Sequence, residues 1–141
     1  MEITSIKKID EHQKYLNDIF VNNEKLLGGY SKYKIPNMEE IDYYEKKVSN
    51  TLIKKIWEKN NDSIRNYMES LCKQNKKINK EEVLKKFKFM VPQIKSSNLL
   101  LIKGQVVAGM NYKAIVSVLF NNIPYGINTE YYEINYFVPL N

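Results

Sequence analysis

The sequence predicts an α+β fold in which helices come first and an antiparallel sheet follows. Hydrophobic residues recur every three or four positions from about residue 5 to residue 87, which is the spacing of amphipathic helices. Between Leu99 and Phe137 they alternate with other residues, as in strands. The chain has 141 residues, of which 43% are hydrophobic and 27% are charged. A single globular domain over residues 1–141 is therefore expected.

Two helices are predicted in the first part of the chain. The first begins near Ser5 and ends near Asn22, and its hydrophobic positions are Ile6, Ile9, Leu16, Ile19 and Phe20. The pair Gly28-Gly29 separates it from the second helix, for which Asn37 is a suitable N-cap. This second helix should run from Met38 to about Lys59. Its hydrophobic stripe, which should pack across the sheet, consists of Ile41, Tyr44, Val48, Leu52 and Ile56.

Shorter helices are predicted between residues 60 and 92. The run Asn60-Asn61-Asp62-Ser63 favours a break in the helix with a fresh N-cap. A short helix then reaches Leu71, and Asn79 is placed to cap a third one, which Pro92 ends. The hydrophobic residues of these helices are Ile64, Tyr67, Met68, Leu71, Val83, Leu84 and Phe87.

Three strands are predicted in the last third of the chain. They cover Leu99 to Val107, Tyr112 to Phe120 and Thr129 to Phe137. A turn at Ala108-Gly109 separates the first two, and residues 121–126 have the composition of a second turn. Connections this short favour an antiparallel meander.

The positive charge of the chain is confined to its first part. The sequence has 22 Lys and Arg against 16 Asp and Glu, a formal net charge of +6. After Gly104 the only charged residues are Lys113, Glu130 and Glu133. Arg65 is the only arginine, and arginine makes most bidentate contacts with phosphate and guanine. Solvated helix surfaces explain scattered lysines equally well, so no nucleic-acid partner is expected.

The residues needed for catalysis or metal binding are scarce. His12 and Cys72 are the only histidine and cysteine, so the chain can form no internal disulfide and offers few metal ligands. The pair Glu39-Glu40 is explained by the dipole of the helix that it begins. The charged N-terminus is unlike a signal peptide, and no apolar run approaches the length of a membrane span. We expect a cytoplasmic protein that is not an enzyme, needs no cofactor or metal and does not bind membranes.

The junction of the first two strands is unusually apolar. It reads Gln105-Val106-Val107-Ala108-Gly109, whereas exposed hairpin tips usually carry polar residues. A partner that buries Val106 and Val107 would explain them. The alternative is ordinary interior strand sequence with a bulge at Gly109.

This segment resembles the first inhibitory hairpin of the cystatin and stefin family, which inhibits papain-like cysteine peptidases. Two further segments are similar to that family. Leu27-Gly28-Gly29 precedes the helix as the family's N-terminal apolar and glycine segment does, and residues 134–140 resemble the strand that enters its second hairpin. In an antiparallel meander the turn after Gln105 and the connection after the last strand share one end of the sheet. The resemblance therefore implies a cystatin-like fold with a single wedge at that end.

The resemblance also implies a function. In this family the wedge fills the active-site cleft without offering a cleavable bond, so the protein would be a reversible, competitive inhibitor of papain-like, cathepsin-type cysteine peptidases. Leu27 would enter a non-primed substrate pocket, and Gly28 and Gly29 would let the backbone approach the enzyme. The remaining peptidase-binding residues would be Gln105, Val106, Val107, Ala108 and Gly109 in the hairpin and Val138, Pro139 and Leu140 on the primed side.

Parts of the chain depart from the family. Residues 1–25 form an N-terminal extension with an extra helix, and residues from about 61 to 95 form a helical insertion before the sheet. The family adds a final strand where this chain ends, so the edge of the last strand would be covered by the extension, covered by another chain or left open. The hairpin would also allow a domain-swapped dimer. The alternative function is a cystatin-like scaffold that binds a protein through its inserted helices without inhibiting a peptidase.

Overall fold

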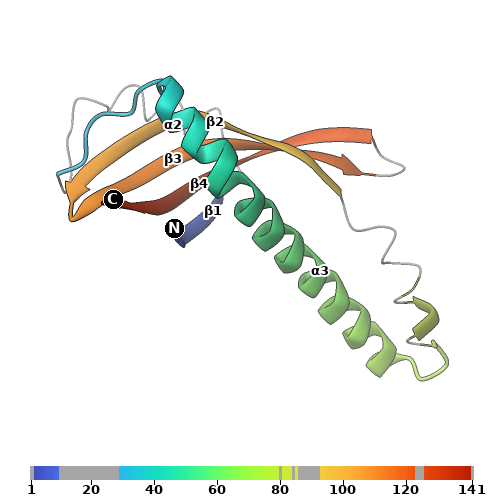
Figure 1. The fold of residues 1–141 in the computed structure, drawn as a ribbon. Helices are drawn as coiled ribbons and strands as arrows, with labels where there is room; N and C mark the ends of the chain where they lie inside the picture. The colour runs from blue at the N-terminus through green and yellow to red at the C-terminus, as the bar shows by residue number, and fades with distance from the viewer. Residues whose placement is uncertain are drawn as a thin grey trace.

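A long helix lies across one face of an antiparallel sheet in the computed structural model of the protein (Figure 1). The structure describes residues 2–9, 29–79, 81–83, 85, 93–122 and 126–140. The elements in these residues are β1 (Glu2–Ile9), α2 (Met38–Tyr43), the π-helical segment η1 (Tyr44–Val48), α3 (Ser49–Gln74), β2 (Gln93–Val107), β3 (Gly109–Asn122) and β4 (Gly126–Pro139). The predicted α+β class, with a long helix on an antiparallel sheet, is confirmed.

The long helix begins at the predicted cap. The side chain of Asn37 accepts a hydrogen bond from the backbone N–H of Glu40 (2.9 Å), and the Glu40 carboxylate accepts one from the Asn37 backbone N–H (2.9 Å). This reciprocal capping box satisfies two backbone donors that the first turn leaves free. The helix therefore starts at Met38, as the sequence predicts.

The π-helical segment η1 aligns the hydrophobic stripe with the sheet. The stripe residues Tyr44, Val48, Leu52 and Ile56 are all buried and are spaced four apart. In a regular helix of 3.6 residues per turn, each four-residue step drifts by about 40°. The wider π turn over Tyr44–Val48 compensates part of this drift, so all four side chains face the strands.

The predicted break at Asn60 is wrong, because α3 continues without interruption to Gln74. Asn, Asp and Ser each cost well under about 1 kcal/mol in a helix interior, and no Gly or Pro stands there to break it. Residues 61–74 therefore belong to the long helix. The Asn79 side chain does accept hydrogen bonds from the backbone N–H groups of Glu81 and Glu82, which confirms that cap. Phe87 and Pro92 lie outside the described residues.

The N-terminal helix predicted from Ser5 is wrong over residues 5–9, which form part of β1 and pair with β4. The three-residue spacing of Ile3, Ile6 and Ile9 resembles helical spacing. An irregularity between Ile3 and Ser5 explains the spacing of the first two, because an extra residue in the strand returns Ile3 and Ile6 to one face. Residues 10–22 of the predicted helix lie outside the described residues.

The sheet has the order β1-β4-β3-β2, and every neighbouring pair is antiparallel. The predicted meander of the last three strands is confirmed, although β2 starts at Gln93 and not at Leu99. Strand β1 covers the edge of β4, so the first of the three predicted arrangements for that edge is the observed one. On the opposite edge, Lys34 exchanges two backbone hydrogen bonds with Ile102 (2.9 and 3.0 Å).

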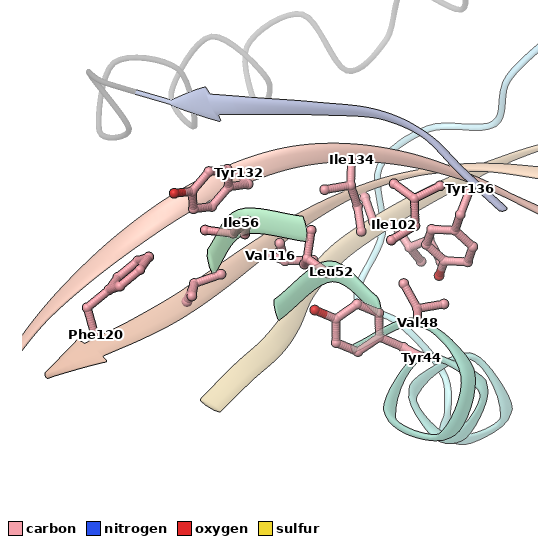
Figure 2. Close-up of a cluster of buried hydrophobic side chains, with 13 residues drawn as sticks. Tyr44, Val48, Leu52, Ile56, Ile102, Val116, Phe120, Tyr132, Ile134 and Tyr136 are labelled. Carbon is pink, nitrogen blue, oxygen red and sulfur yellow. The ribbon is translucent and has the colours of Figure 1, made fainter. Parts of the chain in front are cut away.

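The core lies between the long helix and the sheet (Figure 2). The helix supplies the stripe from Tyr44 to Ile56, and the strands contribute Ile3, Ile102, Ala114, Val116, Val118, Phe120, Tyr132, Ile134 and Tyr136. The Tyr44 hydroxyl forms a hydrogen bond with the Ser97 hydroxyl and so ties the helix to β2. Within the described residues, no helix is long and apolar enough to cross a membrane.

Candidate functional site

The hairpin between β2 and β3 turns at a single residue. Val107 pairs with Gly109, which leaves Ala108 alone at the tip, so the turn stands where the sequence predicts it. Gly109 has φ +128°, and a Cβ added there would lie 2.5 Å from the Val138 carbonyl oxygen. Glycine is therefore required by both the backbone conformation and the space.

The apolar residues of this hairpin are exposed to solvent. Val106 is 79% exposed and Val107 is 43% exposed. The segment is thus a hairpin tip and not interior strand sequence. Exposed branched side chains at a tip cost solubility and are typical of surfaces that bind a partner.

The end of β4 lies directly beside the hairpin. Pro139 is opposite Gly109 and Val138 is opposite Met110. Leu140 follows and is 76% exposed. The predicted C-terminal segment and the hairpin therefore form one continuous apolar surface.

A glycine segment lies on the other side of the hairpin. Gly29 has φ +77°, and a Cβ added there would lie 3.5 Å from Nε2 of Gln105. Ser31 fixes this segment, since its backbone N–H donates to the Gly104 carbonyl (2.8 Å) and its hydroxyl accepts from the Gly104 N–H (3.0 Å). Leu27 and Gly28 lie outside the described residues.

We call the surface formed by these three segments the hairpin edge. Its described residues are Gly29, Gln105, Val106, Val107, Ala108, Gly109, Val138, Pro139 and Leu140. Gly29 lies beside β2, the tip joins β2 to β3, and Pro139 ends β4. The predicted gathering of these residues at one end of the sheet is thus observed for all that the structure describes.

Gln105 belongs to the hairpin, and its side chain has neighbours in the glycine segment and on β3. Its side chain lies in the space that a Cβ at Gly29 would approach, and its Oε1 accepts a hydrogen bond from Nδ2 of Asn111 (3.3 Å), the residue directly opposite on β3. The roles of Asn111 and Ser31 were missed from sequence. The position of Asn111 could have been found by counting, because a one-residue turn at Ala108 places it opposite Gln105.

Two tyrosines hold the chain that follows the glycine segment. Lys103 and Lys113 are directly opposite each other, and like charges in that position destabilise a sheet. The Lys103 ammonium lies 4.5 Å from the Tyr33 ring centre, and that of Lys113 lies 5.3 Å from the Tyr30 ring centre. Burial, and then the charge of Lys113, lower the pKa of Lys103. The ring faces offset the repulsion and fix the tyrosines over the two strands.

Potential metal ligands do not gather in the part of the chain that the structure describes. Cys72 lies near the end of α3, and His12 lies outside that part. Residues 2–9, 29–79, 81–83, 85, 93–122 and 126–140 contain no group of three or more metal-ligating side chains. The hairpin edge consists mainly of apolar side chains and backbone, with Gln105 as its polar side chain.

No protein-family model matches the chain, and comparisons with curated proteins and with solved structures find no match. A function for the protein is therefore inferred from the residues of the hairpin edge and their arrangement.

Proposed function

We propose that the protein is a reversible, competitive inhibitor of papain-like cysteine peptidases, with a cystatin-like fold. One observation carries the proposal: three segments that are far apart in the sequence meet at the hairpin edge, in the order glycine segment, hairpin tip and end of β4. The cystatin and stefin family, which this chain resembles, presents the three segments of its inhibitory wedge in the same order.

The physical character of the hairpin edge suits binding in a cleft. Its tip is narrow, because a single residue joins β2 to β3, and its exposed side chains are apolar. Hairpin, glycine segment and β4 are each fixed by backbone pairing, so little conformational entropy would be lost on docking. A few buried apolar side chains, above all Val106 and Val107, would then supply most of the affinity.

The fold supports the same proposal. A long helix across an antiparallel sheet is compatible with a cystatin-like arrangement. Strand β1 pairs with β4 at the edge where the family has its final strand. The end of β4 is thereby held in place and can present Pro139 and Leu140 to the primed side of a peptidase.

The test is a titration of papain and a cathepsin L-like peptidase with the purified protein, with a serine peptidase as a control. We expect tight, reversible inhibition of the cysteine peptidases only. Val107→Asp should weaken it by about 100-fold, because a carboxylate would be buried in an apolar cleft. The matched control is Ile127→Asp, which places the same charge on an exposed residue at the opposite end of the sheet. Absence of inhibition at micromolar protein, or equal inhibition by both variants, would contradict the proposal.

A second candidate function is that of a non-inhibitory scaffold that binds a protein through its helix. It is favoured by the far part of α3, which extends beyond the sheet (Figure 1) and exposes Tyr67. Under this alternative Val107→Asp would leave partner binding unchanged, whereas Tyr67→Glu would abolish it.

A further inference from the structure

A cleft of about 190 Å³ opens between the first turn of the long helix and the sheet, next to the hairpin edge. Helix residues Glu39, Glu40 and Tyr43 line one side, and Tyr112, Tyr136 and Val138 line the other. Val138 belongs to the hairpin edge as well. A protein that docks on this edge would therefore also cover the mouth of the cleft.

The walls of the cleft are aromatic. The rings of Tyr43 and Tyr136 stack with 6.4 Å between their centres, and those of Tyr112 and Tyr136 lie 5.5 Å apart. Burial raises the pKa of Tyr112 and Tyr136, so their hydroxyls stay neutral at physiological pH. Neutral phenol rings present electron-rich faces, which attract cations within about 6 Å.

Tyr136, a residue of the cleft, is buried as a whole, but its hydroxyl has no hydrogen-bond partner among the described residues. Tyr136 is only 2% exposed, and its hydroxyl makes no hydrogen bond within the part of the chain that the structure describes. Figure 2 shows its ring extending from β4 toward the helix. A donor that enters the cleft would give this hydroxyl a hydrogen-bond partner.

The two carboxylates of the cleft, Glu39 and Glu40, differ in whether a described residue pairs with them. Glu40 is engaged, since it accepts hydrogen bonds from the Asn37 N–H (2.9 Å) and the Lys34 ammonium (2.6 Å). Glu39 is exposed, and none of the described residues forms an ion pair with it. The cleft thus has a net negative charge in a chain whose net charge is +6.

We propose that this cleft binds the positively charged end of an arginine or lysine side chain, presented by the protein that docks on the hairpin edge. The aromatic walls would hold the cation, Glu39 would neutralise it, and the Tyr136 hydroxyl would accept one of its N–H donors. That the side chain belongs to a cysteine peptidase rests on the proposed function. The preference of the cleft for a cation does not rest on the proposed function.

The test is an NMR titration of the full chain with N-acetylarginine amide at low ionic strength. N-acetylcitrulline amide, which has almost the same shape but no charge, is the control ligand. We expect the arginine compound alone to shift the ring signals of Tyr43, Tyr112 and Tyr136. Glu39→Gln should weaken binding by about three- to fivefold, and added salt should do the same. Glu58→Gln, which removes an exposed carboxylate from α3, should leave it unchanged.

Three results would overturn the inference: no shift of the tyrosine rings, equal shifts with the citrulline compound, or equal loss of binding in Glu39→Gln and Glu58→Gln. The outcome is independent of the peptidase assay. If the protein inhibits papain but its cleft does not bind the arginine compound, only this inference fails. If the cleft binds arginine but no cysteine peptidase is inhibited, the proposed function fails and the cation site stands.

Discussion

Gly109 and Pro139 lie directly opposite each other on β3 and β4, which joins the tip of the first hairpin to the end of the last strand. The two segments are neighbouring strands of one sheet, and the chain beside Gly109 is packed too closely to admit a side chain. A Cβ at this position would lie 2.5 Å from a backbone oxygen and 2.7 Å from the Phe137 ring. The hairpin tip and the end of β4 are therefore closely packed against each other where they meet.

Gly109→Ala should destabilise the protein by at least about 2 kcal/mol, since both the positive φ and the contact with the Val138 carbonyl disfavour a side chain. Gly126→Ala is the matched control. Gly126 also has a positive φ, but no described residue lies within 4 Å of the added Cβ, so a loss of roughly 1 kcal/mol is expected. Urea unfolding of both variants measures the difference. Equal losses would mean that the strands separate easily at this end.

Leu52→Ala should lower the free energy of unfolding by about 2 to 5 kcal/mol, because it opens a cavity where the long helix meets the sheet. The exposed Ile127 provides the comparison, and Ile127→Ala should change stability by less than about 0.5 kcal/mol. Urea unfolding followed by circular dichroism reports both values. A small effect of Leu52→Ala would contradict the packing of α3 on the sheet.

Ile3→Asp should detach β1 from β4, because a buried carboxylate without a partner costs several kcal/mol. The uncovered edge of β4 would then pair with other chains, and sedimentation velocity should detect species larger than those of the unsubstituted protein. Ser5→Asp is the control, since Ser5 is exposed on the same strand. Unchanged sedimentation of Ile3→Asp would show that β1 is dispensable for protecting this edge.

Glu133→Gln should stabilise the protein at neutral pH and leave it unchanged at acidic pH. Burial raises the pKa of the Glu133 carboxyl above its ordinary value of 4.5, although the charge of Lys7 lowers it. The folded state therefore binds this proton more tightly than the unfolded state, and stability is lost as the pH rises through the raised pKa. Glutamine does not ionise, so the Glu133→Gln variant does not lose this stability. Unfolding measured from pH 4 to pH 7 tests it, with Glu58→Gln as an exposed control. An advantage of Glu133→Gln that does not grow with pH would contradict the assignment.

Local signals in the sequence predict most of the long helix and the hairpin. The stripe from Tyr44 to Ile56 and the cap at Asn37 identify the helix, because burial and capping depend on neighbouring positions. A single residue, Gly109, likewise predicts the turn at Ala108. The antiparallel meander of the three strands then implies that the hairpin and the end of β4 share one end of the sheet.

Other features depend on contacts between distant residues and were not predictable in this way. β1 looks helical in isolation, and only pairing with β4 together with the irregularity after Ile3 reveals it as a strand. The prediction of a helix break at Asn60 is wrong for a related reason. Packing of the surrounding helix outweighs the small local preference of these residues for a helix cap. The cleft next to the hairpin edge combines residues of α2 with residues of two strands, and no sequence motif links them.

The pairing of β1 with β4 also sets an order of events during synthesis. Glu2 is opposite Phe137, so β1 pairs with a segment that is synthesised much later than itself. Closing so long a stretch of chain is entropically costly and slows folding. The hairpin of β2 and β3, which needs only local contacts, can form earlier. β4 would dock next, and β1 would join last and complete the sheet.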